Sequence, residues 1–180
     1  HLCFDHLIIN IMLMKKLLLF TLLIIGILTG CSSAEKKVIN GTLKTYQEPL
    51  SFAKVDILTK DFKYNSWNGE YQPGGIQLEI TNITSKPLNI IWEESSLNNG
   101  VIFKDGMKYI DAGKTPPKLV LFPNSKQTLI IYPSNSVEYV SGQYGGWKIK
   151  GFEENEFPIK IILTFEQDGV KDSYIGEVVR

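Results

Sequence analysis

Apolar and polar residues alternate along short segments of this chain, as they do in β-strands that bury one face. The clearest segment is 75–82 (GIQLEITN), where Ile76, Leu78 and Ile80 share one face and polar side chains occupy the other. No long window keeps the 3.6-residue period of an amphipathic helix. Residues 38–180 are therefore predicted to form a single all-β domain. Further strands are expected at 52–58, 87–93, 101–103, 107–110, 128–132, 158–167 and 170–179.

Turn residues separate these segments and indicate how they pair. Asp105-Gly106 and Asp168-Gly169 each lie between two of the predicted strands. The Asp-Gly dipeptide favours the tight turns of two-residue β-hairpins, so we expect an antiparallel hairpin at each place. Short strands spaced roughly ten residues apart predict a β-sandwich of about seven to nine antiparallel strands. Trp92 falls on the apolar face of its strand and is expected in the core.

The first thirty residues differ from the rest and are not expected to belong to the fold. Lys15-Lys16 follows Met14 and precedes an uninterrupted apolar run, Leu17–Leu28. As a helix this run would be roughly 18 Å long, against a hydrocarbon core of ~30 Å, so a signal peptide over 14–30 is favoured over a membrane span. Residues 1–13 are interpreted as upstream or mis-started sequence, and an unusually long charged region before the apolar run is the alternative.

The apolar run ends in Leu28-Thr29-Gly30-Cys31, which resembles the lipobox of bacterial lipoproteins. The resemblance implies cleavage before Cys31, a diacylglycerol thioether on its sulfur, an acylated amino group, and a short tether over 31–37. The residue after the cysteine is Ser32 and not Asp, which in a Gram-negative cell implies that the lipoprotein is transferred to the outer membrane. In a Gram-positive cell, the resemblance implies a location on the outer face of the cell membrane. The alternative is an uncleaved signal anchor in which Cys31 is an ordinary residue.

The remaining residues loosely resemble the immunoglobulin-like domains of uncharacterised bacterial lipoproteins. The resemblance rests on the segment LEITNITSKPLNIIW (78–92) and on Pro123-Asn124-Ser125 ahead of another predicted strand. It implies an immunoglobulin-like β-sandwich. The cysteine pair that joins the sheets of true immunoglobulin domains is absent, so the resemblance extends to the architecture only.

Composition excludes several kinds of chemistry after residue 30. Both histidines precede that point, and Cys31 is the one cysteine beyond it. A Ser-His-Asp or Cys-His catalytic site, a Cys/His zinc site and an internal disulfide are therefore excluded. The chain carries 19 basic and 19 acidic residues, and this zero net charge gives no general attraction to nucleic acid. We expect no cofactor and no metal, and interpret the acidic run 153–156 as a solvated loop.

Two aromatic groups on Gly- and Asn-rich segments are the candidate binding residues. Tyr64, Trp67 and Tyr71 lie in a predicted loop at 62–75, and Tyr144 and Trp147 lie near Gly142 and Gly145-Gly146, close to Tyr139. Exposed aromatic rings bind sugar faces or form the centre of protein interfaces. The alternative is that these rings cover one end of the sandwich.

Together these features predict a lipid-anchored protein of the bacterial cell envelope rather than an enzyme. It would act by non-covalent binding or as a structural component, with the membrane as one partner through its lipid. One alternative is a carbohydrate-binding module that uses its loop aromatics. Another is an inhibitor or immunity lipoprotein against an envelope-attacking enzyme, which would bind an envelope protein. No single carboxylate pair is favoured for catalysis.

Overall fold

The computed structural model describes residues 37–46, 49–143 and 145–179, which form fourteen strands and three short 3-10 turns. Cys31, the preceding lipobox residues and Tyr144 lie outside the described residues. Among the described residues there is no helix with the length and hydropathy needed to span a membrane. The strands are β1 (Val38–Asn40), β2 (Thr42–Thr45), β3 (Ala53–Ile57), β4 (Asp61–Asn65), β5 (Glu70–Gln72), β6 (Ile76–Asn82), β7 (Leu88–Leu97), β8 (Ile102–Lys104), β9 (Leu119–Leu121), β10 (Lys126–Pro133), β11 (Val137–Val140), β12 (Gly146–Ile149), β13 (Ile159–Gln167) and β14 (Val170–Val179).

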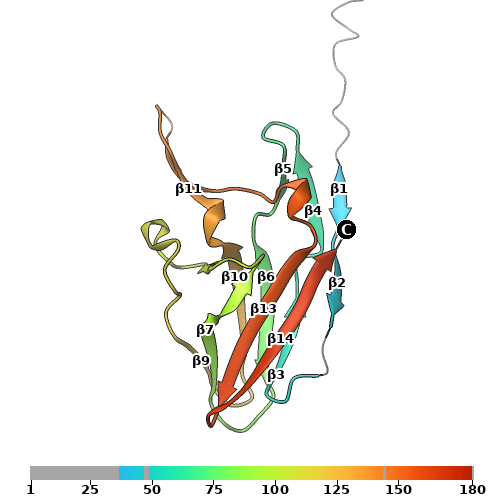
Figure 1. The fold of residues 1–180 in the computed structure, drawn as a ribbon, viewed down its shortest axis with the longest axis vertical. Coiled ribbons are helices and arrows are strands. Elements are labelled where there is room, and N and C mark those ends of the chain that lie inside the picture. The colour runs from blue at the N-terminus through green and yellow to red at the C-terminus, as the bar shows by residue number, and fades with distance from the viewer. Residues whose placement is uncertain (1–36, 47–48, 144, 180) are drawn as a thin grey trace, which may run out of the picture. The chain divides into compact units, whose positions relative to one another are not determined.

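Two antiparallel sheets make the body of the domain (Figure 1). One has the order β3-β6-β10-β8 and the other the order β2-β14-β13-β7-β9. Seven of these strands correspond, in chain order, to strands A to G of an immunoglobulin sandwich: β3, β6, β7, β8, β10, β13 and β14. With these letters, the first sheet has the order A-B-E-D and the second contains G-F-C. The added strands β2 and β9 lie at the two edges of the second sheet. The predicted all-β, immunoglobulin-like sandwich is confirmed.

The core between the two sheets follows the alternation seen in the sequence. Ile76, Leu78 and Ile80 of β6 are fully buried, as predicted, and β13 buries a matching row of apolar side chains. Each such side chain contributes roughly 1.5–3 kcal/mol of burial free energy, so these rows dominate the stability of the fold. Trp92 is also buried, and its indole nitrogen donates to the Pro117 carbonyl at 3.0 Å.

One of the two predicted hairpins forms and the other does not. At Asp168-Gly169 both residues have positive φ, 52° and 77°, and β13 and β14 pair along their whole length. Gly106 also turns with a positive φ of 79°, but the residues after it form no strand. The chain leads instead into a 3-10 turn at Tyr109–Asp111, where the Tyr109 ring stacks on Phe103. Here the side-chain stacking redirects a segment whose turn residues favour a hairpin.

Residues 53–82 form one long antiparallel hairpin that is bent in the middle. Its lower half, β3 with β6, belongs to the four-stranded sheet, and its upper half, β4 with β5, pairs with β1 in a separate three-stranded sheet. Gly74 and Gly75 lie at the bend, where a Cβ on Gly75 would be 2.3 Å from the Tyr132 ring. Glycine is therefore required for this close approach. The predicted loop at 62–75 is largely this upper hairpin, because its residues pair as strands.

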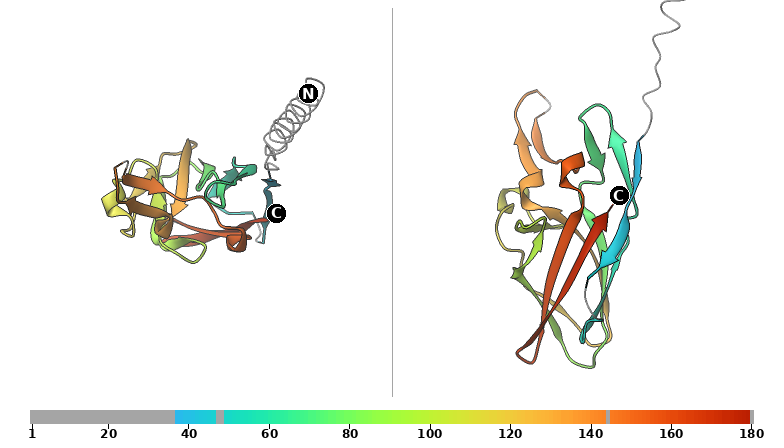
Figure 2. Two further views of the ribbon diagram at one scale, coloured as in Figure 1. Left: turned by 90° about the horizontal axis from the view of Figure 1, so that it is seen from above. Right: turned by 45° about the vertical axis from the view of Figure 1, so that its right-hand side comes forward.

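The hairpins β4–β5 and β11–β12 extend from the same end of the sandwich, as Figures 1 and 2 show. The opposite end carries the turns at 83–87 and 122–125 and the β13–β14 turn. There the buried side chain of Asn82 joins two turns, because its amide nitrogen donates to the carbonyls of Lys86, Leu121 and Phe122 at 2.7, 3.3 and 3.1 Å.

The side-chain oxygen of Asn82 also forms hydrogen bonds. The Asn82 carbonyl oxygen accepts from the backbone nitrogen and the hydroxyl of Thr84, at 3.0 and 2.9 Å. Gln167, at the end of β13, donates its amide to the Thr84 hydroxyl at 2.7 Å. The segment ITNITSKP is therefore held by a buried polar network that connects both sheets.

Candidate functional site

Two of the predicted binding residues belong to the core of the upper hairpin. Tyr71 is only 2 % exposed and lies against Tyr64 and Phe157, with ring centroids 5.2 and 5.8 Å away. Tyr64 is half-buried, and the Lys37 ammonium lies 5.7 Å from its ring centroid. The prediction that Tyr71 presents its ring to a ligand is wrong. Strand alternation turns that ring inward, and it covers one end of the sandwich, as the alternative interpretation held.

Trp67 is at the tip of the same hairpin and is almost entirely exposed. Its side chain is 95 % accessible, and its backbone nitrogen donates to the Asn65 side chain at 3.0 Å, which closes the turn. Gly69, with φ of 72°, completes this turn. The tip therefore presents a single indole ring to solvent, and the structure separates it from the buried tyrosines of the same segment.

The second predicted group gathers around β11 and β12. Tyr139 and Trp147 are directly opposite each other in the register of this two-stranded sheet. Their rings meet edge to face, with centroids 5.6 Å apart and planes inclined at 70°. Tyr139 is 64 % exposed and Trp147 is 43 % exposed, so neither ring is a core residue. Trp147 therefore keeps its place among the candidate binding residues.

A third exposed ring, which the sequence did not single out, completes this group. Tyr109 lies nearly parallel to Trp147, with centroids 6.2 Å apart and a 12° angle between planes. Its other neighbour is Phe103 at 5.9 Å and 20°, a ring that is only 2 % exposed. Offset stacking at these separations is favourable. Tyr109, Tyr139 and Trp147 are called the aromatic surface from here on, and the buried ring of Phe103 supports it through Tyr109.

Within strands β11 and β12, the charged side chains lie on the face opposite Tyr139 and Trp147. Glu138 is paired across the strands with Lys148, and its carboxylate lies 3.0 Å from the Lys148 ammonium and 2.9 Å from that of Lys150. Hydrogen bonds from Lys150 and Lys148 lower the pKa of Glu138, and Glu138 raises the pKa of Lys150. Since side chains alternate across a strand, Tyr139 and Trp147 point away from these ions. Recognition by this face would rest on stacking and hydrogen bonding.

The acidic run near the end of the upper sheet has a local structural role. Glu153 and Glu156 form a capping box around the 3-10 turn Glu154–Glu156, in which the Glu153 nitrogen donates to the Glu156 carboxylate at 2.6 Å. Within the described residues, no group of three or more His, Cys, Asp or Glu side chains is arranged to hold a metal ion. The aromatic surface is the candidate site that the geometry supports best.

A comparison with protein-family models finds no match, and searches among curated proteins and solved structures find none either.

Proposed function

We propose that this protein is a lipid-anchored binding protein of the bacterial cell envelope, and that the aromatic surface contacts its ligand without catalysis. The lipobox resemblance at 28–31 supports the anchor, and the arrangement of three rings supports the binding role. The observation that carries the proposal is that Tyr109, Tyr139 and Trp147, from two separate segments, contact one another while they are 40–64 % exposed. Tyr109 in turn stacks on the buried ring of Phe103.

Glycan is the ligand class that this surface fits best. Sugars present apolar C–H faces to aromatic rings and hydroxyl groups to polar neighbours, and they carry little charge for ions to attract. The aromatic surface offers ring faces and two tyrosine hydroxyls, with the lysines and Glu138 of the hairpin on its other side. Rings held by stacking lose little freedom on binding, which favours affinity. A cell-wall glycan is also the polymer that a lipid-tethered domain meets.

Tryptophan fluorescence tests this proposal directly, because Trp67, Trp92 and Trp147 lie in three different environments. Titration with soluble peptidoglycan fragments is expected to quench the tryptophan fluorescence of the protein. Tyr139→Ala should weaken the binding of these fragments about tenfold, which is the usual loss of affinity when an aromatic residue of an interface is removed. Tyr139 is the most exposed of the three rings, so its removal should leave the fold intact.

The matched control is Trp67→Ala, which removes an exposed indole at the tip of the other hairpin. We expect it to leave the affinity for the fragments unchanged. If Trp67→Ala abolishes binding while Tyr139→Ala has no effect, the ligand binds at the hairpin tip and the assignment to the aromatic surface is wrong. Absence of quenching by any fragment would exclude glycan as the ligand.

A protein partner is the second candidate, favoured by the edge strand β9. Its residues are all apolar, and Val120 and the following Phe122 are 40 % and 74 % exposed. Among the described residues β9 pairs with β7 alone, so its outer edge can accept a partner's strand. An inhibitor or immunity lipoprotein would bind its target one to one through such an edge. We expect Val120→Lys to weaken such a complex about tenfold and Tyr139→Ala to leave it intact, as measured by calorimetry with the purified partner.

A further inference from the structure

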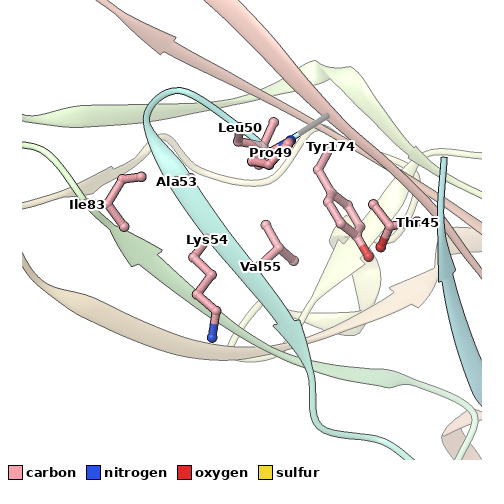
Figure 3. Close-up of a pocket in the computed structure, with 8 residues that line it drawn as sticks. All are labelled: Thr45, Pro49, Leu50, Ala53, Lys54, Val55, Ile83 and Tyr174. Atoms are coloured by element: carbon pink, nitrogen blue, oxygen red, sulfur yellow. The ribbon is translucent and has the colours of Figure 1, made fainter. Parts of the chain in front are cut away.

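A cavity of about 470 Å³ lies where the edge of one main sheet meets the edge of the other. Ala53 and Val55 of β3 line it from the four-stranded sheet, and Thr45 of β2 and Tyr174 of β14 line it from the five-stranded sheet (Figure 3). Leu50 and Ile83 add apolar walls. This volume is within the range of small-molecule sites. The cavity shares no lining residue with the aromatic surface.

The Tyr174 hydroxyl is a buried polar group that has no hydrogen-bond partner of ordinary length and angle within the part of the chain that the structure describes. The residue is 4 % exposed. Burial is the largest effect and raises the pKa of Tyr174, whereas hydrogen bonding with the Thr45 side chain acts in the opposite direction. The hydroxyl therefore keeps its proton at neutral pH and is a donor. Leaving such a donor unsatisfied costs free energy, so it requires an explanation.

The position of this hydroxyl is fixed by the backbone of its own strand. A Cβ on Gly176 would lie 2.6 Å from the Tyr174 hydroxyl oxygen and 2.9 Å from the ring carbon that bears it. The ring therefore lies across the glycine, which is paired in register with Thr45 of the neighbouring strand. Glycine weakens the interior of a strand, so its presence here makes room for the ring rather than strengthening the sheet.

The charge of the described lining residues favours a neutral occupant. Lys54 is the one charged residue among them, and its ammonium is already 2.7 Å from the Asp56 carboxylate. The two hydroxyls of Thr45 and Tyr174 lie on one side of β3, whereas Ile83 lies on the other (Figure 3). The site thus has a hydrogen-bonding end and an apolar end.

We propose that this cavity binds a small neutral molecule with a hydrocarbon body and one oxygen acceptor, a carbonyl or an ether, which accepts a hydrogen bond from the Tyr174 hydroxyl. The hydrocarbon lies against Leu50, Val55 and Ile83. Thr45, on the exposed strand β2, lies beside this hydroxyl at the same end of the cavity (Figure 3).

The probe for this proposal is 2-octanone, added to the full chain in detergent, with affinity taken from the rise in Tm with probe concentration. Tyr174→Phe keeps the ring and removes the donor. We expect it to bind the ketone about fivefold more weakly than the natural protein, the ratio for one hydrogen bond. Without the probe, Tyr174→Phe should have the higher Tm because an unsatisfied buried hydroxyl has been removed. Partition of 2-octanone into the detergent micelles is the same for both proteins, so it cancels in the ratio of their affinities.

A blocking variant separates the cavity from other apolar surfaces. Ile83 is 52 % exposed, so Ile83→Trp fills the apolar end without disturbing the core, and it is expected to abolish the rise in Tm. Equal affinities of the natural protein and Tyr174→Phe would overturn the proposal, as would a rise in Tm that persists in Ile83→Trp. Failure of 2-octanone to raise the Tm of the natural protein at millimolar concentration would overturn it as well.

Discussion

Replacement of Cys31 by Ala is expected to abolish the labelling of this protein with palmitate, because our proposal assigns the acyl chains to this residue from the lipobox resemblance at 28–31. Each buried methylene contributes about 0.8 kcal/mol, so two or three chains hold a protein stably on a membrane. The zero net charge of the chain provides no general attraction to anionic lipid. Metabolic labelling of the variant beside the natural protein measures the loss.

The chain offers a matched control in Cys3, its other cysteine. We expect Cys3→Ala to leave labelling unchanged, because the lipobox resemblance involves Cys31 and not Cys3. Palmitate labelling that persists in Cys31→Ala would contradict this assignment, and a natural protein that keeps residues 14–30 and carries no lipid would favour the uncleaved signal anchor.

Replacement of Asn82 by Ala is expected to lower the free energy of unfolding by about 3 kcal/mol. The side chain is fully buried, and its amide donates to three backbone carbonyls while its oxygen accepts from Thr84. Alanine removes the hydrogen bonds by which this side chain joins the two turns. Denaturant unfolding followed by tryptophan fluorescence measures the change, since buried Trp92 reports on the core.

Two further variants identify the cause of this loss. Asn82→Asp keeps the size and an acceptor oxygen but removes the donors and buries a charge, so it should be at least as destabilising as alanine. Asn135→Ala makes the same change at an exposed position and should alter stability by less than about 0.5 kcal/mol. A loss below about 1 kcal/mol in Asn82→Ala would mean that the network does not hold the turns together.

Local alternation predicted the architecture because the side chains that fill the core are set by a two-residue period. The buried row of β6 and the pairing of β13 with β14 are both properties of short segments, and both are confirmed. The turn at Asp168-Gly169 follows from the conformations these two residues favour. By contrast, Met107–Ile110 fails to form a strand because Tyr109 stacks between Phe103 and Trp147, a contact between segments far apart in the sequence.

The candidate site could be predicted only in part, for the same reason. Trp147 and Tyr139 were recognisable as aromatic residues beside glycines, but the sequence does not indicate that Tyr109 joins them. Tyr71 looked equivalent to Trp67, and only the bend and register of the β4–β5 hairpin place one ring in the core and the other in solvent. Asn82 lies in the segment 78–92 that resembles immunoglobulin-like domains, but its hydrogen-bond partners come from turns that only the folded chain brings together.

The most direct test of this account is the intact mass of the protein recovered from bacterial membranes. The account predicts a chain that begins at Cys31 and carries the mass of a diacylglycerol thioether, with a further acyl group on the new amino terminus. A chain that still includes residues 14–30 and carries no lipid would contradict it.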